Sequence, residues 1–96
     1  MSANVVVAVD DARMRLVANL PDADARTALD ADFSTLDKAL LDNRVADART
    51  ALATIYSRLA SMRVAGSGGT LVDTPDAAAI RLDLVPTATA LGVVAQ

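Results

Sequence analysis

The side chains of this chain that could take part in catalysis are twelve aspartates, a few serines and a single tyrosine. Histidine, cysteine and tryptophan are absent. This removes imidazole bases, thiolate nucleophiles, disulfides and the usual zinc and haem ligands. Any chemistry would therefore depend on carboxylates and hydroxyl groups.

The spacing of these groups does not favour catalysis. Asp10 and Asp11 are adjacent, and Asp30 and Asp32 are two apart, so neither pair would align on one face of a helix. A serine nucleophile would have only Lys38 as a possible base. We expect no catalytic residues, and we expect that the protein is not an enzyme.

The sequence also lacks the patterns that are typical of metal-binding and phosphate-binding sites. Asp22 and Asp24 could hold a hard cation only with loop oxygens between them, and no calcium-loop pattern is present. The run from Gly66 to Thr70 lacks the lysine that a phosphate-binding loop requires. We expect no metal and no cofactor.

The composition indicates one acidic, alanine-rich globular domain over residues 1–96. Apolar residues make up 53% of the chain and charged residues 22%, with a net charge of -3 and 21 alanines. An acidic chain with two aromatic residues is a poor ligand for nucleic acid. The longest apolar run, Val5–Val9, cannot span a bilayer, and no secretory signal is visible. We expect a soluble protein, cytoplasmic by default, or periplasmic or secreted if an export signal was removed.

Apolar residues three and four apart predict helices through most of the chain. The strongest signal is in the third segment, where six apolar residues from Val45 to Met62 fall on one stripe. Similar stripes run through the other three segments, and the fourth reaches Val94. The expected architecture is all-α, a four-helix up-and-down antiparallel bundle with helices near 3–20, 23–41, 44–65 and 75–95. The expected centre of the core is Leu16, Leu29, Phe33, Leu36, Leu52, Ile55, Leu59, Ile80 and Leu84.

Proline and glycine mark the connections. The glycine-rich run 66–69 predicts a loop that reaches about Asp73. Thr74 and Pro75 are typical of a helix start. Pro86 lies inside the fourth helical pattern and has no amide hydrogen, so this helix should be kinked or broken there.

A strand interpretation competes at two places. Residues 5–9 are rich in valine, and residues 80–84 alternate between apolar and polar, so the two could pair in a small sheet. Such a sheet would be marginal by itself, and the helix start at Thr74 favours the helical alternative.

One hexapeptide occurs twice. Residues 24–29 and 47–52 both read Asp-Ala-Arg-Thr-Ala-Leu. The separation of 23 residues is shorter than that of common helical repeat proteins, which does not favour a solenoid. The alanine and leucine, four apart, should face the core, and the Asp and Arg should face water. We also expect exposed i,i+4 ion pairs such as Asp22–Arg26, Arg26–Asp30 and Asp11–Arg15.

The run from Leu40 to Leu52 resembles the inter-helix turn and following helix of alanine-rich bacterial helical-hairpin proteins, some of them exported. The resemblance covers roughly residues 22 to 64. It implies a four-helix architecture and export, and no activity.

Two functions remain open from the sequence. The first is a structural or protein-interaction module, with a protein partner or a homodimer, because the chain is highly apolar and lacks catalytic groups. The uncharged stretch 87–96 is its expected apolar surface. The alternative is a carrier of a small apolar ligand held between helices near Phe33 and Tyr56. Tyr56 itself is expected to seal the edge of the bundle with its hydroxyl in water.

Overall fold

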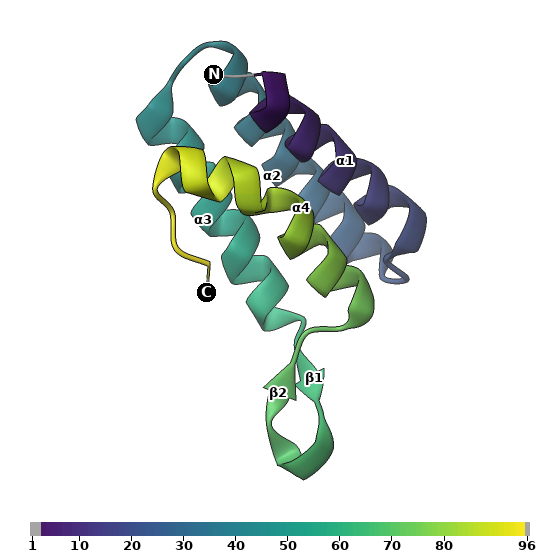
Figure 1. Ribbon diagram of the computed structural model, residues 1–96. Coiled ribbons are helices and arrows are strands. Elements are labelled where there is room, and N and C mark those ends of the chain that lie inside the picture. Colours follow the sequence, from purple (N-terminus) through teal and green to yellow (C-terminus); the bar gives the residue numbers. More distant parts are fainter. Residues whose placement is uncertain (1–2, 96) are drawn as a thin grey trace.

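The computed structural model describes residues 3–95, together with their side chains except those at positions 3, 4, 17 and 18. Four helices account for most of this part of the chain (Figure 1). Their bounds are α1 (Ala3–Asn19), α2 (Ala23–Leu41), α3 (Val45–Ser61) and α4 (Pro75–Leu91). The all-α prediction is therefore confirmed at the level of fold class.

Two helix starts have the side-chain caps that their sequences suggest. The Asp22 carboxylate accepts hydrogen bonds from the amides of Asp24 and Ala25 at the start of α2. The Thr74 hydroxyl accepts one from Ala77 at the start of α4, where Pro75 occupies a position that needs no amide hydrogen. These caps satisfy backbone donors that would otherwise have no partner in the helix.

Two helices end several residues earlier than predicted. The third helix stops at Ser61 and not near 65, because the chain turns into a strand at Val64. The fourth stops at Leu91 and not near 95, because Gly92 adopts a left-handed conformation with φ of 69°. Glycine reaches this conformation at little steric cost, so it ends the helix.

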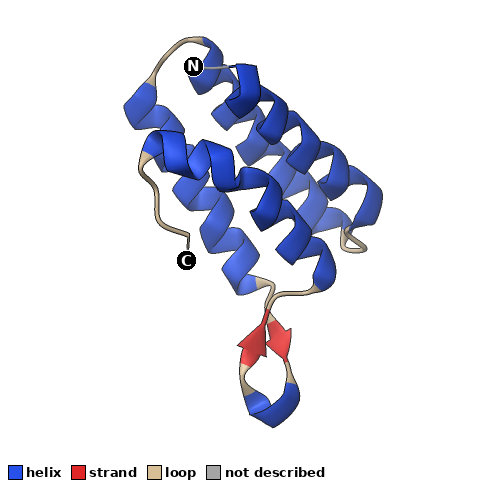
Figure 2. Ribbon diagram, in the orientation of Figure 1, coloured by secondary structure: helices blue, strands red, loops and turns tan. Residues whose placement is uncertain are grey.

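The glycine-rich segment that was predicted to be a loop forms the turn of a short β-hairpin. Strands β1 (Val64–Ala65) and β2 (Leu71–Val72) pair antiparallel, with Val64 opposite Val72, around a 3₁₀ turn at Ser67–Gly69. The hairpin projects beyond the end of the helices (Figure 2). The competing strands at 5–9 and 80–84 do not form, because both segments lie inside α1 and α4.

The helices pack in pairs around one apolar core. Contacts are most extensive between α1 and α4 and between α2 and α3, and they are least extensive between α3 and α4. All nine residues predicted for the centre of the core have no exposed surface. Burial of these large apolar side chains is the main favourable contribution to folding.

Some predicted stripe positions are not buried. Val45, at the first residue of α3, is 41% exposed, and Val94, beyond the end of α4, is 86% exposed. The stretch 87–96 was expected to be an apolar surface, yet Thr87, Ala88 and Leu91 are buried. The Thr87 hydroxyl donates to the carbonyl oxygen of Val5, so the polar group is satisfied inside the contact between α1 and α4.

The helix containing Pro86 continues to Leu91, so it is not broken there. Among the described residues, no helix is both long enough and apolar enough to cross a membrane.

Candidate interaction surface

In the part of the chain that the structure describes, ion pairs between helices engage three of the aspartates, namely Asp30, Asp32 and Asp83. Arg13 on α1 makes two hydrogen bonds to Asp30 on α2, with Nε 2.7 Å from Oδ1. This hydrogen bonding raises the pKa of Arg13. Arg15 on α1 pairs with Asp83 on α4, and Asp32 and Arg58 link α2 to α3.

The predicted i,i+4 ion pairs were wrong. Two of these side chains pair with a neighbouring helix instead, namely Asp30 with Arg13 and Arg15 with Asp83. Asp22 instead caps the start of its own helix, α2. The reason is geometric: residues at the edge of a buried stripe lie next to the neighbouring helix, where an oppositely charged group is closer than one a turn away.

The repeated hexapeptide places both of its arginines at helix ends. Arg26 donates from Nη1 to the carbonyl oxygen of Leu20, which follows the last residue of α1. Arg49 donates from Nε to the carbonyl oxygen of Leu91, the last residue of α4. A cation at a helix C-terminus satisfies a carbonyl that has no helical partner and interacts favourably with the helix dipole. The repeat thus has a structural role in both copies.

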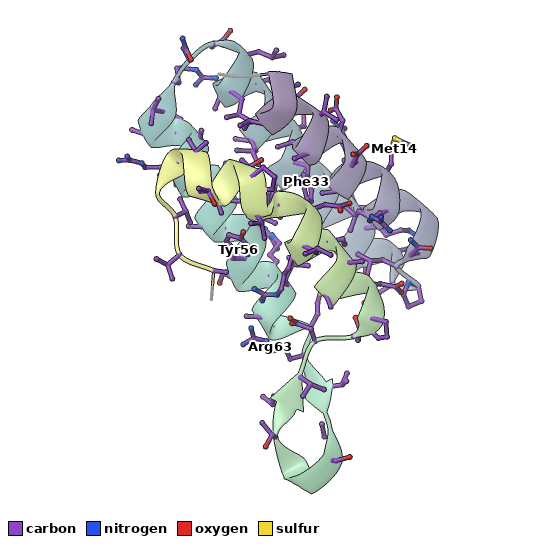
Figure 3. All side chains as sticks on the ribbon, in the orientation of Figure 1. Met14, Phe33, Tyr56 and Arg63 are labelled. Atoms are coloured by element: carbon purple, nitrogen blue, oxygen red, sulfur yellow. The ribbon has the colours of Figure 1, made fainter. Side chains whose placement is uncertain are left out.

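The densest group of charged and aromatic side chains lies at the base of the hairpin. Asp73 stands between two arginines, with Arg63 Nε 3.1 Å from Oδ1 and Arg81 Nε 2.9 Å from Oδ2. The Arg81 guanidinium lies 5.5 Å from the centre of the Tyr56 ring. Figure 3 shows Arg63 at the end of α3 where the hairpin begins.

Tyr56 does not seal the edge of the bundle as predicted. It is 1% exposed, because α4 brings Arg81 over its ring. Burial raises the pKa of the Tyr56 hydroxyl, and the positive charge of Arg81 partly opposes this shift.

The ion pairs of this group link the base of the hairpin to α4. The Asp73 carboxylate is engaged by two guanidinium groups. Nε and Nη2 of Arg81 are buried and make no well-directed hydrogen bond to a described residue. The Asp73 charge and the Tyr56 ring offset that deficit. Within the described part of the chain, no cluster of three acidic residues is arranged to hold a metal ion.

The surface has several shallow hollows. One between α2 and α3 has a volume of about 250 Å³ and is lined mainly by polar side chains, including Thr35, Thr50 and Thr54. Each of these hydroxyls donates to a carbonyl one turn earlier in its own helix. Two more hollows, of about 300 and 340 Å³, meet at Ala25, Ser61 and Met62 near the end of the bundle. Phe33 and Tyr56, the rings proposed to hold a ligand, line none of these hollows.

A fourth hollow lies in an exposed apolar surface on the outer side of α1 and α4. The groove has a volume of about 260 Å³ and is lined by Val7, Ala8, Asp11, Leu82, Asp83 and Pro86. We use the name α1–α4 face for the surface formed by Val7, Ala8, Asp11, Met14, Leu82 and Pro86.

The α1–α4 face exposes large apolar side chains. Exposure reaches 54% for Val7, 69% for Met14 and 72% for Leu82. Figure 3 shows Met14 pointing away from the bundle, whereas Phe33 lies inside it. Val7 and Met14 are seven apart in α1, which places them on the same side of the helix.

No protein-family model, curated protein or solved structure gives a significant match to this chain. Its function therefore has to be argued from its own surface.

Two exposed residues of this surface, Val7 and Leu82, lie in the segments for which the sequence also allows strands. Val7 lies in the run 5–9, and Leu82 lies in the alternating segment 80–84, which were weighed as strands. Once both segments are helical, each has one apolar residue too many for its buried stripe. These additional residues, Val7 and Leu82, are exposed to solvent.

Proposed function

We propose that the protein is a non-catalytic interaction module that binds a protein partner through the α1–α4 face. The observation that carries this proposal is the groove that the exposed Val7 and Leu82 line on the outer side of two adjacent helices, with Met14 exposed two turns beyond Val7 on α1. Exposed apolar groups gathered around a concave surface are typical of interaction sites, whereas single exposed apolar residues are ordinary.

The proposal includes the arrangement of the helices. We infer an up-and-down bundle, because the contacts between α1 and α4 follow an antiparallel order. Val5 meets Thr87, and Arg15, further along α1, meets Asp83, which is earlier in α4. Contacts between α3 and α4 follow the same order, with Arg49 at Leu91 and Tyr56 at Arg81. This is the architecture that the resemblance to bacterial helical-hairpin proteins implies.

A bend at Pro86 is part of the same proposal. The carbonyl oxygen of Leu82 cannot accept the usual hydrogen bond from residue 86, because proline has no amide hydrogen. Figure 1 draws a change of direction about midway along α4. A bend there would turn the last part of α4 while leaving Leu82 and Pro86 on the outer side.

The test is a photo-crosslinking experiment in the cells that express the protein naturally. A photoreactive amino acid replaces Leu82 in one variant and Leu41 in the other; Leu41 is 68% exposed but lies at the end of α2. We expect a covalent adduct with a protein from position 82 and none from position 41. No adduct from position 82, or equal adducts from both positions, would contradict the proposal.

The second candidate function is the binding of a small apolar ligand. One observation favours a site other than the region of Phe33 and Tyr56. The two hollows that meet at Ala25 and Met62 are bordered by apolar groups, including Leu20 and Leu29. Native mass spectrometry of the purified protein tests this alternative. A bound small molecule that is lost in Met62→Gln would support it, and a mass equal to that of the bare chain would count against it.

A further inference from the structure

The α1–α4 face has the shape of a surface that can bind itself. Leu82 is 72% exposed and also borders the groove, so a protruding side chain and a depression lie side by side. In a two-fold symmetric interface the same patch is used by both copies. The Leu82 of each copy would then enter the groove of the other, beside Val7 and Pro86.

The charges of this surface are also self-complementary. Asp11 lies in the groove, and none of the side chains that the structure describes forms an ion pair with it. Arg15 follows one turn later on α1 and is about half exposed. In an antiparallel arrangement of two copies, Asp11 of one faces Arg15 of the other, and the relation is repeated by symmetry.

Arg15 can make this contact without losing its internal partner. Its ion pair with Asp83 uses Nε, with 2.5 Å to Oδ2. A guanidinium also has N–H donors on Nη1 and Nη2. A single Arg15 can therefore bridge Asp83 of its own chain and Asp11 of a second copy.

The available area agrees with a reversible dimer. Helices of 17 residues, the length of α1 and α4, are each about 25 Å long. Contact along their whole length would cover at most roughly 500 Å² per copy, or about 1,000 Å² in the pair, and the bend proposed at Pro86 reduces this area. This area is below the roughly 1,200–2,000 Å² of stable specific interfaces, so the dimer should dissociate on dilution.

We propose that the partner bound by the α1–α4 face is a second copy of this chain, in a two-fold dimer with Leu82 in the opposite groove and Asp11 facing Arg15 of the other copy. This inference rests on the proposed function, because it names the partner of the same surface. It predicts that the purified protein dimerises in the absence of any other component.

Sedimentation equilibrium of the purified full chain tests the dimer. We compare the unaltered protein with Leu82→Gln and, as a matched control, Leu41→Gln. Both substitutions replace a leucine exposed by about two thirds or more with a neutral helix-forming residue. We expect a monomer–dimer equilibrium in the micromolar range for the unaltered protein and for Leu41→Gln, with dimerisation weakened about tenfold or more in Leu82→Gln.

A charge variant tests the orientation of the two copies. Asp11→Arg should weaken the dimer by about tenfold, since the introduced guanidinium would face Arg15 of the other copy and repel it. Asp42→Arg changes the charge by the same amount at an exposed position near the end of α2, and it should leave dimerisation unchanged. Far-ultraviolet circular dichroism of each variant verifies that the helices are intact.

The results separate this inference from the proposed function. A protein that stays monomeric at millimolar concentration overturns the dimer. If position 82 still crosslinks to a different protein in cells, the interaction module stands with another partner. If Leu82→Gln and Asp11→Arg both dimerise as strongly as the unaltered protein, the chain associates through another surface. This result would also overturn the inference.

Discussion

Arg49 on α3 donates a hydrogen bond from Nε to the carbonyl oxygen of Leu91, 2.7 Å away at the last residue of α4. The two residues are 42 positions apart. Contacts between α3 and α4 are otherwise the least extensive of the four helix interfaces, so this bond fixes the far end of α4. Gly92 then turns the chain out of the helix directly after the bonded carbonyl.

Substitution of Arg49 should therefore destabilise the fold. We expect Arg49→Gln to lower the free energy of unfolding by about 1 kcal/mol, since it removes a charged hydrogen bond to a helix end. Urea denaturation measures the change. Arg44→Gln is the control, because its ion pairs with Asp42 and Asp47 are exposed and should contribute about 0.5 kcal/mol or less. If both variants lose the same unfolding free energy, the hydrogen bond to Leu91 contributes no more to stability than the exposed ion pairs of Arg44.

The hairpin should depend on Asp73. In Asp73→Asn the Arg81 guanidinium, which is 13% exposed, keeps its charge but loses the opposing carboxylate. Removing one partner of a buried ion pair lowers the free energy of unfolding, because the other charge is left without a partner. Since this pair is partly exposed, we expect a loss of about 2 kcal/mol. Urea denaturation measures the loss of stability.

Amide hydrogen exchange then locates the effect. The amide of Gly66 bonds to the carbonyl oxygen of Thr70 within the hairpin, at 2.8 Å. This amide should exchange faster in Asp73→Asn than in Asp42→Asn, where the altered carboxylate is exposed at the other end of the bundle. If exchange at Gly66 is the same in both variants, the ion pairs do not hold the hairpin.

Stability should fall at high pH because of Tyr56. Burial raises the pKa of its hydroxyl in the folded state above the ordinary value of about 10. As the pH rises through about 10, the unfolded chain loses this proton first, which favours unfolding. The contribution is therefore complete below pH 10 and is lost as the pH rises toward the folded-state pKa.

Tyr56→Phe isolates this effect, since Tyr56 is the only tyrosine of the chain. The midpoint of urea denaturation should fall less steeply above pH 10 in Tyr56→Phe than in the unaltered protein. The ultraviolet absorbance of phenolate should also titrate at a higher pH in the folded protein than in urea. Parallel stability curves for the two proteins would rule out the proposed shift.

The helices and the core could be predicted because they depend on local spacing. Leu29 and Phe33 recur at helical intervals, and burying them removes apolar surface from water wherever the neighbouring helix lies. The Thr74 cap was predictable for the same reason, since it involves only residues within one turn. The hairpin was missed because its strands have two residues each, too few to show an alternating pattern.

The partners of charged residues could not be predicted in the same way. Arg13 and Asp30 are 17 positions apart, and Arg63 and Asp73 are joined across the hairpin. Such contacts depend on which helix edges meet, and sequence spacing contains no information about that. The exposed Leu82 belongs to the same class, because the spacing alone does not show which side of α4 remains uncovered.

The sequence by itself determined that the chain forms helices, where most of them begin, and which side chains fill the centre of the core, because these outcomes follow from interactions within a few residues and from the period of the helix. Only the tertiary structure decided which arginine meets which carboxylate, that Tyr56 lies beneath Arg81, and that Val7 and Leu82 border one groove. Those outcomes depend on the relative placement of elements distant in the chain, and that placement is set by the packing of the whole core.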